Sequence, residues 1–274
     1  MAYSAYVPCF NNSSSVGEAL RSLQAQAPPP TQLLLVDDGS SDESRSIAEL
    51  LGVTVVSMGH NAGRGAVRAC SIDLAKCEYV ACCDATNYLP PDYVARALHW
   101  FADLRVAAVC GPISQQHPKT QADRWRDRHL FKISSTMSVQ HRSLLSTYGC
   151  VVRTSAVREV GNYNQLCRHS EDIDLGRRLL DAGYDVVFDP ALIVYSGVSN
   201  TIPQVLERYW RWHAGAQEQT TIRGYMKNVW YSIRFMMLQD LHDKDIASLW
   251  LTLLCPHYQF WRSWLRRSSG QVQR

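Results

Sequence analysis

The sequence predicts an α/β protein with a mostly parallel β-sheet flanked by helices, and two observations support this prediction. First, short apolar segments typical of strands alternate with segments whose apolar residues recur at helical spacing, over residues 3–189. Such alternation is typical of right-handed β-α-β units, in which parallel strands are covered by helices. Second, the apolar run 33–36 leads into Asp37 and Asp38, at the carboxyl end of a strand where such sheets bind ligands.

Local signals assign the elements of the first half in order. We expect strands over residues 3–7, 32–36, 53–58, 79–83 and 106–110. The helices between them are expected over residues 16–27, 44–51, 64–75 and 92–101. The first helix should follow a capping box of Ser15 and Glu18, and the second a capping box of Ser40 and Glu43. Three consecutive prolines, residues 28–30, should end the first helix.

The pattern changes after residue 112. Residues 115–146 are polar and rich in arginine and histidine, which is typical of a long excursion carrying substrate loops or of a solvated helix. Regular elements return with a strand over 148–153, helices over 155–160 and 171–182, and a strand over 185–189. We therefore expect one α/β domain over residues 1–200, with halves 1–112 and 113–200, and a helical C-terminal extension over 201–274.

The composition is that of a globular protein and excludes several classes. Of 274 residues, 46% are hydrophobic and 19% are charged, which excludes a mostly disordered chain. A net charge of +3, with no basic and aromatic stripe up to residue 200, argues against nucleic-acid binding. The nine cysteines contain no C-x-x-C pair and the chain does not start like a signal peptide, so we expect a reducing, cytoplasmic location.

The C-terminal extension combines aromatic and basic residues. The apolar run 246–255 is too short to span a bilayer of about 30 Å. It leads into residues 260–267, which contain two tryptophans and three arginines close together. This pattern is typical of a peripheral contact with the inner face of a membrane, and equally of a helix packed on the main domain with its arginines reaching to water.

Asp37 and Asp38 have two readings from the residues themselves. At a strand end, a carboxylate can accept hydrogen bonds from a nucleobase or from ribose hydroxyls. The alternative is that both carboxylates cap the following helix and interact with its dipole. Glu171 and Asp172 have the same ambiguity, because a general base and the acid-rich first turn of a helix capped by Ser170 look alike in sequence.

The order of short motifs over residues 3–200 resembles the family-2 glycosyltransferases, which have the GT-A fold. The similar segments are Val7-Pro8-Cys9-Phe10-Asn11, Val36-Asp37-Asp38-Gly39-Ser40-x-Asp42, Asn61-x-Gly63 followed by Arg68, Asp84-Ala85-Thr86-Asn87, and Glu171-Asp172-x-Asp174-Leu175-x-x-Arg178 followed by Ala182-Gly183-Tyr184. The resemblance implies a Rossmann-like nucleotide-sugar-binding half followed by an acceptor-binding half.

The resemblance also implies roles for individual residues. The implied donor site consists of Pro8, Phe10, Asp37, Asp38, Arg68, Asp84 and Ala85. Asp172, beside Glu171, would take the proton from the acceptor hydroxyl, as an inverting hexosyl transfer requires. Arg208, Arg211 and His213 would neutralise the leaving diphosphate.

The chain departs from the family at its metal site. Thr86 stands where the family usually has an aspartate that holds a divalent metal, and Ser196 stands near a usual histidine. Mn²⁺ or Mg²⁺ would then rest mainly on Asp84, so we expect a weak site.

We therefore expect a glycosyltransferase that moves a sugar from a nucleotide-sugar to a glycan or lipid-linked acceptor, in polysaccharide or glycan biosynthesis. An inactive sugar-nucleotide-binding protein is an alternative because of Thr86. A nucleotidyltransferase is a second alternative, although residues 8–20 lack the lysine or arginine of a phosphate loop.

Overall fold

The computed structural model describes residues 1–131, 137–168, 170–214 and 221–268. The chain forms two compact units. Unit 1 contains Met1–Gln116 and Ser135–Val198, and unit 2 contains His117–Ser134 and Ser199–Arg274. The boundary near residue 200 thus resembles the expected one, but residues 117–134 group with the C-terminal helices and not with the sheet.

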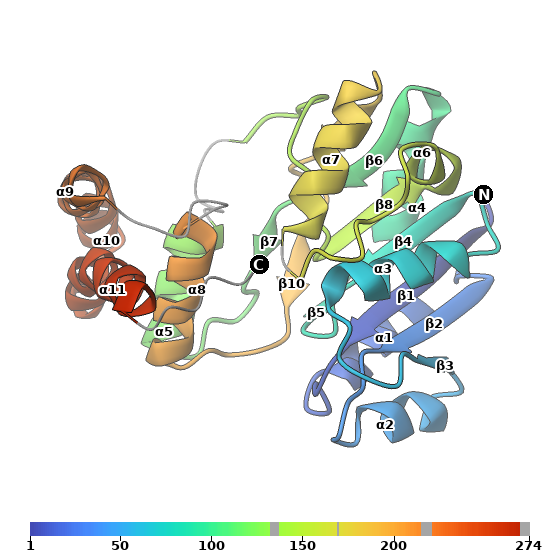
Figure 1. The fold of residues 1–274 in the computed structure, drawn as a ribbon, viewed down its shortest axis with the longest axis horizontal. Coiled ribbons are helices and arrows are strands. Elements are labelled where there is room, and N and C mark those ends of the chain that lie inside the picture. The colour runs from blue at the N-terminus through green and yellow to red at the C-terminus, as the bar shows by residue number, and fades with distance from the viewer. Residues whose placement is uncertain (132–136, 169, 215–220, 269–274) are drawn as a thin grey trace. The chain divides into compact units, whose positions relative to one another are not determined.

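Unit 1 is built on a seven-stranded sheet with the order β3-β2-β1-β4-β8-β6-β9 (Figure 1). The strands are β1 (Tyr3–Cys9), β2 (Gln32–Asp37), β3 (Thr54–Ser57), β4 (Tyr79–Cys83), β6 (Val106–Cys110), β8 (Gly149–Arg153) and β9 (Asp185–Phe188). All neighbours pair in parallel except β8, which is antiparallel to both β4 and β6. The predicted mostly parallel sheet is therefore confirmed.

Helices cover the sheet and a second, smaller sheet lies beside it. The helices of unit 1 are α1 (Val16–Gln24), α2 (Ser44–Leu50), α3 (Arg64–Asp73), α4 (Tyr93–His99), α6 (Thr154–Glu159) and α7 (Glu171–Asp181). The small sheet has the order β5-β10-β7, formed by Asn87–Tyr88, Val194–Ser196 and Ile113–Ser114. Apolar side chains from α3, α6 and α7 pack on strands that include β4, β6 and β8, and form one buried core.

Neither predicted capping box forms. Ser15 precedes α1, but its hydroxyl makes no capping hydrogen bond to the helix. Glu43, and not Ser40, occupies the position before α2, and the Ser40 hydroxyl accepts a hydrogen bond from the Asn11 amide instead. Both expectations were wrong. For Ser40 a tertiary contact replaces the local cap, whereas the Ser15 hydroxyl is buried without a hydrogen-bond partner among the described residues.

Unit 2 is helical. It contains α5 (Gln121–Arg126) with a following π-helical turn (Asp127–Phe131), α8 (Ile202–Ala214), α9 (Ile222–Tyr231), a π-helical turn (Ser232–Met236), α10 (Met237–His242), a 3-10 turn (Ile246–Ser248) and α11 (Leu249–Ser268). The predicted helical extension is therefore confirmed, with α5 added to it. Within the described residues, no helix has both the length and the apolar character needed to cross a bilayer.

Candidate active site

Three of the predicted site aspartates in unit 1 lie at the carboxyl ends of central strands. Asp37 ends β2 and Asp38 follows it, while Asp84 follows β4. Asp38 donates its amide hydrogen to the Cys9 carbonyl at the end of β1, at 2.8 Å. Parallel pairing of β2, β1 and β4 therefore brings together residues that are up to 47 positions apart in the sequence (84 − 37).

Arg68 joins this strand end to the start of α7. Its Nε donates to Glu171 Oε1 at 3.0 Å, and its Nη2 donates to Asp84 Oδ1 at 2.8 Å. Its Nη1 donates to Cys82 Sγ at 2.8 Å and to the Tyr6 hydroxyl at 3.4 Å. The Arg68 residue is only 2% exposed, so one buried guanidinium fixes two carboxylates that come from distant parts of the chain.

The charges of this network stabilise one another. Burial by itself lowers the pKa of the Arg68 guanidinium. The nearby Cys82, Asp84, Tyr6 and Glu171 together have a larger and opposite effect, so the pKa lies well above its usual value. Arg68 is therefore a cation at every physiological pH. Glu171 is 2% exposed, and its Oε1 lies 3.0 Å from Arg68 Nε, so this carboxylate is buried together with a cation.

Asp172 lies next to this ion pair and has a different environment. It is half-buried, and its Oδ1 accepts a hydrogen bond from the Ile173 amide at 2.9 Å. Burial raises the pKa of the Asp172 carboxyl, the neighbouring Glu171 raises it further, and Arg68 opposes the rise. A carboxylate with a raised pKa is a stronger base than an exposed aspartate, which suits proton abstraction from a hydroxyl.

Asp37 and Asp38 hold backbone at the end of β2. Both Asp37 oxygens accept from the Ser40 amide, at 3.1 and 3.2 Å. Asp38 accepts from the amides of Ala62 and Gly63, at 2.7 and 3.0 Å. Asp37 also forms an ion pair with Arg45 in the first turn of α2, with 3.8 Å between Oδ2 and Nε. Asp38 therefore fixes the loop that begins α3, the helix of Arg68, and its expected contact with a nucleotide stays a prediction.

Gly39 makes this arrangement possible. Its φ is +79°, and a Cβ at this position would lie 2.8 Å from the backbone carbonyl carbon of His60. A side chain here would thus be strained and would also push the loop 60–63 away from Asp38.

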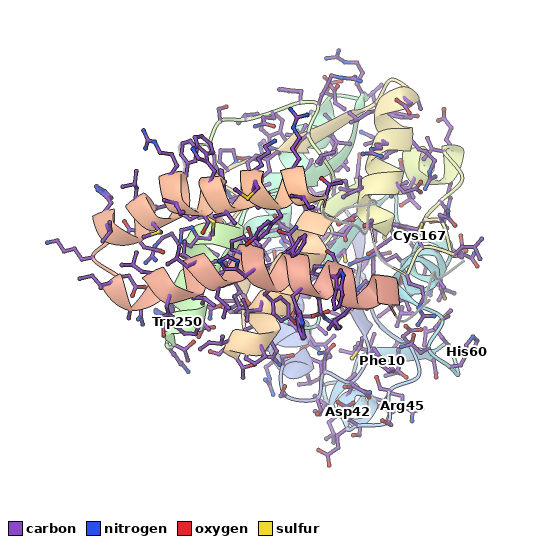
Figure 2. The ribbon with its side chains drawn as sticks, turned by 60° about the vertical axis from the view of Figure 1, so that its left-hand side comes forward. Phe10, Asp42, Arg45, His60, Cys167 and Trp250 are labelled. Carbon is purple, nitrogen blue, oxygen red and sulfur yellow. The ribbon has the colours of Figure 1, made fainter. Side chains whose placement is uncertain are left out.

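The remaining predicted donor residues at the sheet edge lie at the carboxyl ends of β1 and β4. Pro8 is half-buried in β1, and Ala85 is buried directly after Asp84. Phe10, labelled in Figure 2, follows β1 and is 44% exposed. All three guanidinium nitrogens of Arg68 donate to protein groups. The structure gives it a positioning role, and a direct contact with a nucleotide stays a prediction.

Two residues of the network were missed in the sequence. Tyr6 and Cys82 lie directly opposite each other on β1 and β4, beneath the Arg68 guanidinium. A signal was present, since Cys82 precedes Asp84 by two positions and two-residue spacing places side chains on one face of a strand. What the sequence did not give was the pairing of β1 with β4.

The described residues do not fit a protein-built metal site. No group of three or more His, Cys, Asp or Glu side chains that could hold a metal ion occurs among the residues that the structure describes. Asp84 Oδ1 is already paired with Arg68, and the Thr86 hydroxyl supplies only a neutral oxygen, 3.5 Å from Asn87 Oδ1. A hard cation prefers several anionic oxygens, so weak metal use stays the prediction.

The predicted diphosphate residues belong to unit 2. Arg208 is half-buried on α8. The side chains of Arg211 and His213 lie outside the described residues, so the structure does not test their role.

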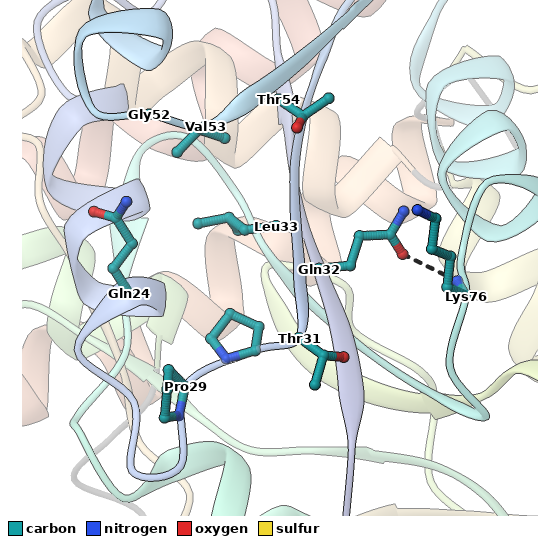
Figure 3. Close-up of a pocket in the computed structure, with 10 residues that line it drawn as sticks. Gln24, Pro29, Thr31, Gln32, Leu33, Gly52, Val53, Thr54 and Lys76 are labelled. Carbon is teal, nitrogen blue, oxygen red and sulfur yellow. Dashed lines mark hydrogen bonds between the residues drawn. The ribbon is translucent and has the colours of Figure 1, made fainter.

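A cavity of about 390 Å³ lies elsewhere in unit 1 (Figure 3). Its lining includes Gln32 and Leu33 at the amino end of β2, Thr54 at the amino end of β3, and Lys76. It contains none of the predicted site residues. The carboxyl-end cluster around Arg68 is therefore the candidate active site, and this cavity is not part of it.

Comparison with known proteins gives a family and several relatives. The profile of Glycosyl transferase family 2 matches residues 4–161. A poly-β-1,6-N-acetyl-D-glucosamine synthase of Staphylococcus epidermidis is 23% identical over 92% of this chain and 63% of its own length. A pre-mycofactocin glycosyltransferase of Mycobacterium tuberculosis is 25% identical over 69% of this chain and 41% of its own length. The chain thus spans less than two thirds of the length of these relatives.

Solved structures show the same fold. A mannosyltransferase of Pyrobaculum calidifontis in complex with GDP-Man and Mn²⁺ matches with a TM-score of 0.67 and 14% identity, over 99% of this chain and 88% of that one. TarS 1-349 of S. aureus in complex with UDP-GlcNAc matches with a TM-score of 0.54 and 14% identity, over 100% of this chain and 93% of that one. The expected GT-A fold is confirmed by these matches.

Proposed function

Because the chain belongs to glycosyl transferase family 2, we propose that it transfers one sugar from a nucleotide-sugar donor to an acceptor hydroxyl, with inversion at the anomeric carbon. The observation that carries this proposal is the network of Arg68. It fixes Asp84, at the strand end where a donor would bind, and Glu171, which precedes the candidate base Asp172. Donor position and base are thus held by one buried side chain.

The proposed step is a direct displacement. The acceptor oxygen bonds to the anomeric carbon while the bond from that carbon to the nucleotide diphosphate breaks, and Asp172 takes the proton from the acceptor hydroxyl. The raised pKa of Asp172 favours this proton transfer. The developing charge on the diphosphate needs cations, and Arg208, Arg211 and His213 are the proposed groups. No step is assigned to a metal ion, since the described residues do not form a site for one.

Donor and acceptor are proposed by class. A nucleotide-sugar is supported by the family and by the structural neighbours with bound GDP-Man and UDP-GlcNAc. A glycan or lipid-linked acceptor is supported by the poly-N-acetylglucosamine synthase among the relatives. We also propose a cytoplasmic location with contact to the inner face of the membrane through the C-terminal segment, since Trp261 and Trp264 are both exposed on α11.

The test of the proposed function is the substitution Asp172→Asn, which keeps the shape of the side chain and removes the base. We expect turnover to fall by about 10²-fold or more, with donor affinity close to that of the wild type. The matched control is Asp181→Asn, an exposed aspartate at the other end of α7. Wild-type turnover in a folded Asp172→Asn protein contradicts the assignment.

Measurements on the wild type separate the proposal from its main rival. If the protein is an inactive sugar-nucleotide-binding protein, as Thr86 suggests, calorimetry will detect donor binding while neither hydrolysis nor transfer occurs in the wild type.

A further inference from the structure

Two helical segments of unit 2 bury several polar side chains, beside the apolar Met236, Leu251 and Cys255, and expose many large apolar side chains. We call them the helix pair: residues 222–242, which comprise α9, a π-helical turn and α10, and α11 (Leu249–Ser268). They run alongside each other (Figure 2). The polar residues in the interior of the pair are between 0% and 5% exposed, and they are Ser232, Asp240, Thr252, Gln259 and Ser263.

These buried polar groups bond to one another. The Ser232 hydroxyl donates to the Thr252 carbonyl at 2.5 Å, and Asn228 Nδ2 donates to Gln259 Oε1 at 2.9 Å. The Thr252 hydroxyl donates to Asp240. Hydrogen bonds therefore link the two helices from within, as small polar side chains do between helices in lipid.

The opposite face of the helix pair is apolar and open. We call it the outer face, and its members are between 37% and 59% exposed: Met226, Trp230, Ile233, Phe235, Leu238, Leu241, Trp250, Leu253, Leu254, Trp261 and Trp264. Helical spacing aligns most of them, since 226, 230, 233 and 241 form one stripe and 250, 253, 254, 261 and 264 form another, while Phe235 and Leu238 lie outside these stripes, at and after the π-helical turn. A soluble helix buries such a stripe, so this one requires an apolar partner.

The charges around the outer face indicate the nature of that partner. Residues 222–239 and 249–268 contain no aspartate or glutamate. Arg223, Lys227 and Arg234 are exposed on the first segment and make no ion pair with any residue that the structure describes. Tryptophan and leucine next to unpaired cations suit the boundary between anionic headgroups and acyl chains.

We propose that the outer face of the helix pair lies in the surface of an anionic phospholipid bilayer, with both helices parallel to the membrane plane. A second copy of the chain is a poorer partner, because joining two outer faces would bring the same cations together. This inference extends the membrane contact in the proposed function. The proposed contact now includes both helices of the pair and not only residues 261–267. It does not depend on sugar transfer.

The test is flotation of the full chain with vesicles of phosphatidylcholine alone or mixed with phosphatidylglycerol. We expect the protein to float with the anionic vesicles, and less so at high salt. The outer-face variant Trp230→Ser, Ile233→Ser, Leu238→Ser should lose vesicle binding on the order of 10-fold or more, because three apolar side chains that would enter the acyl boundary are removed. The control variant Leu50→Ser, Leu104→Ser, Leu166→Ser changes unit-1 leucines that are 78% to 90% exposed, and should float normally.

Three outcomes overturn the proposal. Wild-type flotation of a folded outer-face variant, checked by circular dichroism, removes the first segment from the contact and leaves α11 alone. A wild-type dimer in light scattering that becomes monomeric in the outer-face variant, with no flotation, makes the face a protein interface. A wild-type monomer that binds neither vesicle excludes a membrane contact. Donor hydrolysis, measured on the same samples without vesicles, reports on the sugar-transfer proposal separately.

Discussion

Arg68 is the residue on which the candidate active site depends. Removing it leaves Glu171 as a buried carboxylate without a cation, which typically costs 3–5 kcal/mol of stability. We expect Arg68→Met to lower the free energy of unfolding by about this amount and to abolish turnover. Denaturant unfolding measures the first effect, and Arg64→Met, an exposed arginine one turn earlier on α3, is the stability control.

A double variant makes the test of Arg68 specific. If the loss comes from the unpaired charge, Arg68→Met with Glu171→Gln will recover part of the stability, because the remaining side chain is neutral. Equal stability of the single and double variants contradicts the ion-pair explanation.

Asp38 is expected to contribute to nucleotide binding. Asp38→Ala should weaken the binding of a nucleoside diphosphate by about 1–3 kcal/mol, since hydrogen-bond partners are left unpaired. The variant also frees the amides of Ala62 and Gly63, so Asp38→Asn, which keeps one acceptor oxygen, should bind better than Asp38→Ala. Calorimetry that gives unchanged affinity for both variants removes Asp38 from the donor site.

The raised pKa of Asp172 predicts a pH dependence. The base is active only when ionised, so kcat/KM should fall as the pH drops through a pKa above the usual value for aspartate. A raised folded-state pKa also means that ionising Asp172 destabilises the fold, and this destabilisation grows as the pH rises from the unfolded pKa through the folded one. A rate profile whose acidic limb matches an ordinary aspartate contradicts this prediction.

At the scale of elements, the sequence predicted what depends on local patterns. The strands Tyr79–Cys83 and Val106–Cys110 begin and end where periodicity placed them, because both are buried apolar runs between polar residues. The antiparallel direction of β8 was not predictable, since strand direction depends on how residues 111–148 return to the sheet. Likewise, no local pattern shows that α5 belongs to the helical unit, because buried contacts such as Trp125 Nε1 to the Thr252 hydroxyl span 127 positions.

Asp240 links the helices of unit 2, and its environment predicts acid sensitivity. It is fully buried and bonds to Arg128, to His129 at 2.7 Å and to Thr252. Burial raises the pKa of Asp240, but the bonds to His129, Thr252 and Arg128 lower it below its usual value. A lowered folded-state pKa stabilises above the unfolded pKa, and this stability is lost as the pH falls through the folded pKa, that is, below about pH 4.

The acid sensitivity can be measured by tryptophan fluorescence against pH. We expect Asp240→Asn to destabilise unit 2 by about 3–5 kcal/mol at neutral pH, because Arg128 loses a buried counter-charge. Asp243→Asn, which removes a more exposed partner of Arg128, should change the stability by less than about 1 kcal/mol. Equal effects of the two variants contradict a central role for Asp240.

At the scale of the whole molecule, the chain combines a GT-A domain with a helical unit. The order of motifs predicted the first, and the change in residue pattern after about residue 201 predicted the second. In unit 1, Arg68, Asp84 and Glu171, which come from three of the short segments, meet in one hydrogen-bonded network that no single segment indicates. The exposed apolar face and the buried polar side chains of the helix pair were not predicted, because the sequence shows apolar and polar stripes without showing which of them faces inward.

The metal dependence of the full chain is the last prediction, and it follows from Thr86. A neutral hydroxyl in place of a carboxylate compensates less of the free energy that Mn²⁺ or Mg²⁺ loses on dehydration. The Asp84 carboxylate also forms an ion pair with Arg68. We therefore expect transfer either to persist in chelator or to need high metal concentrations, and Arg211→Ala to be severely impaired if it persists. The measurement is transfer rate against free Mn²⁺ and Mg²⁺.

Thr86→Asp should shift activation to lower metal concentration, and calorimetry of a nucleoside diphosphate with and without Mn²⁺ should show the same shift without turnover. Tight, absolute dependence at micromolar metal in the wild type would mean that Asp84 and groups other than residue 86 build the site.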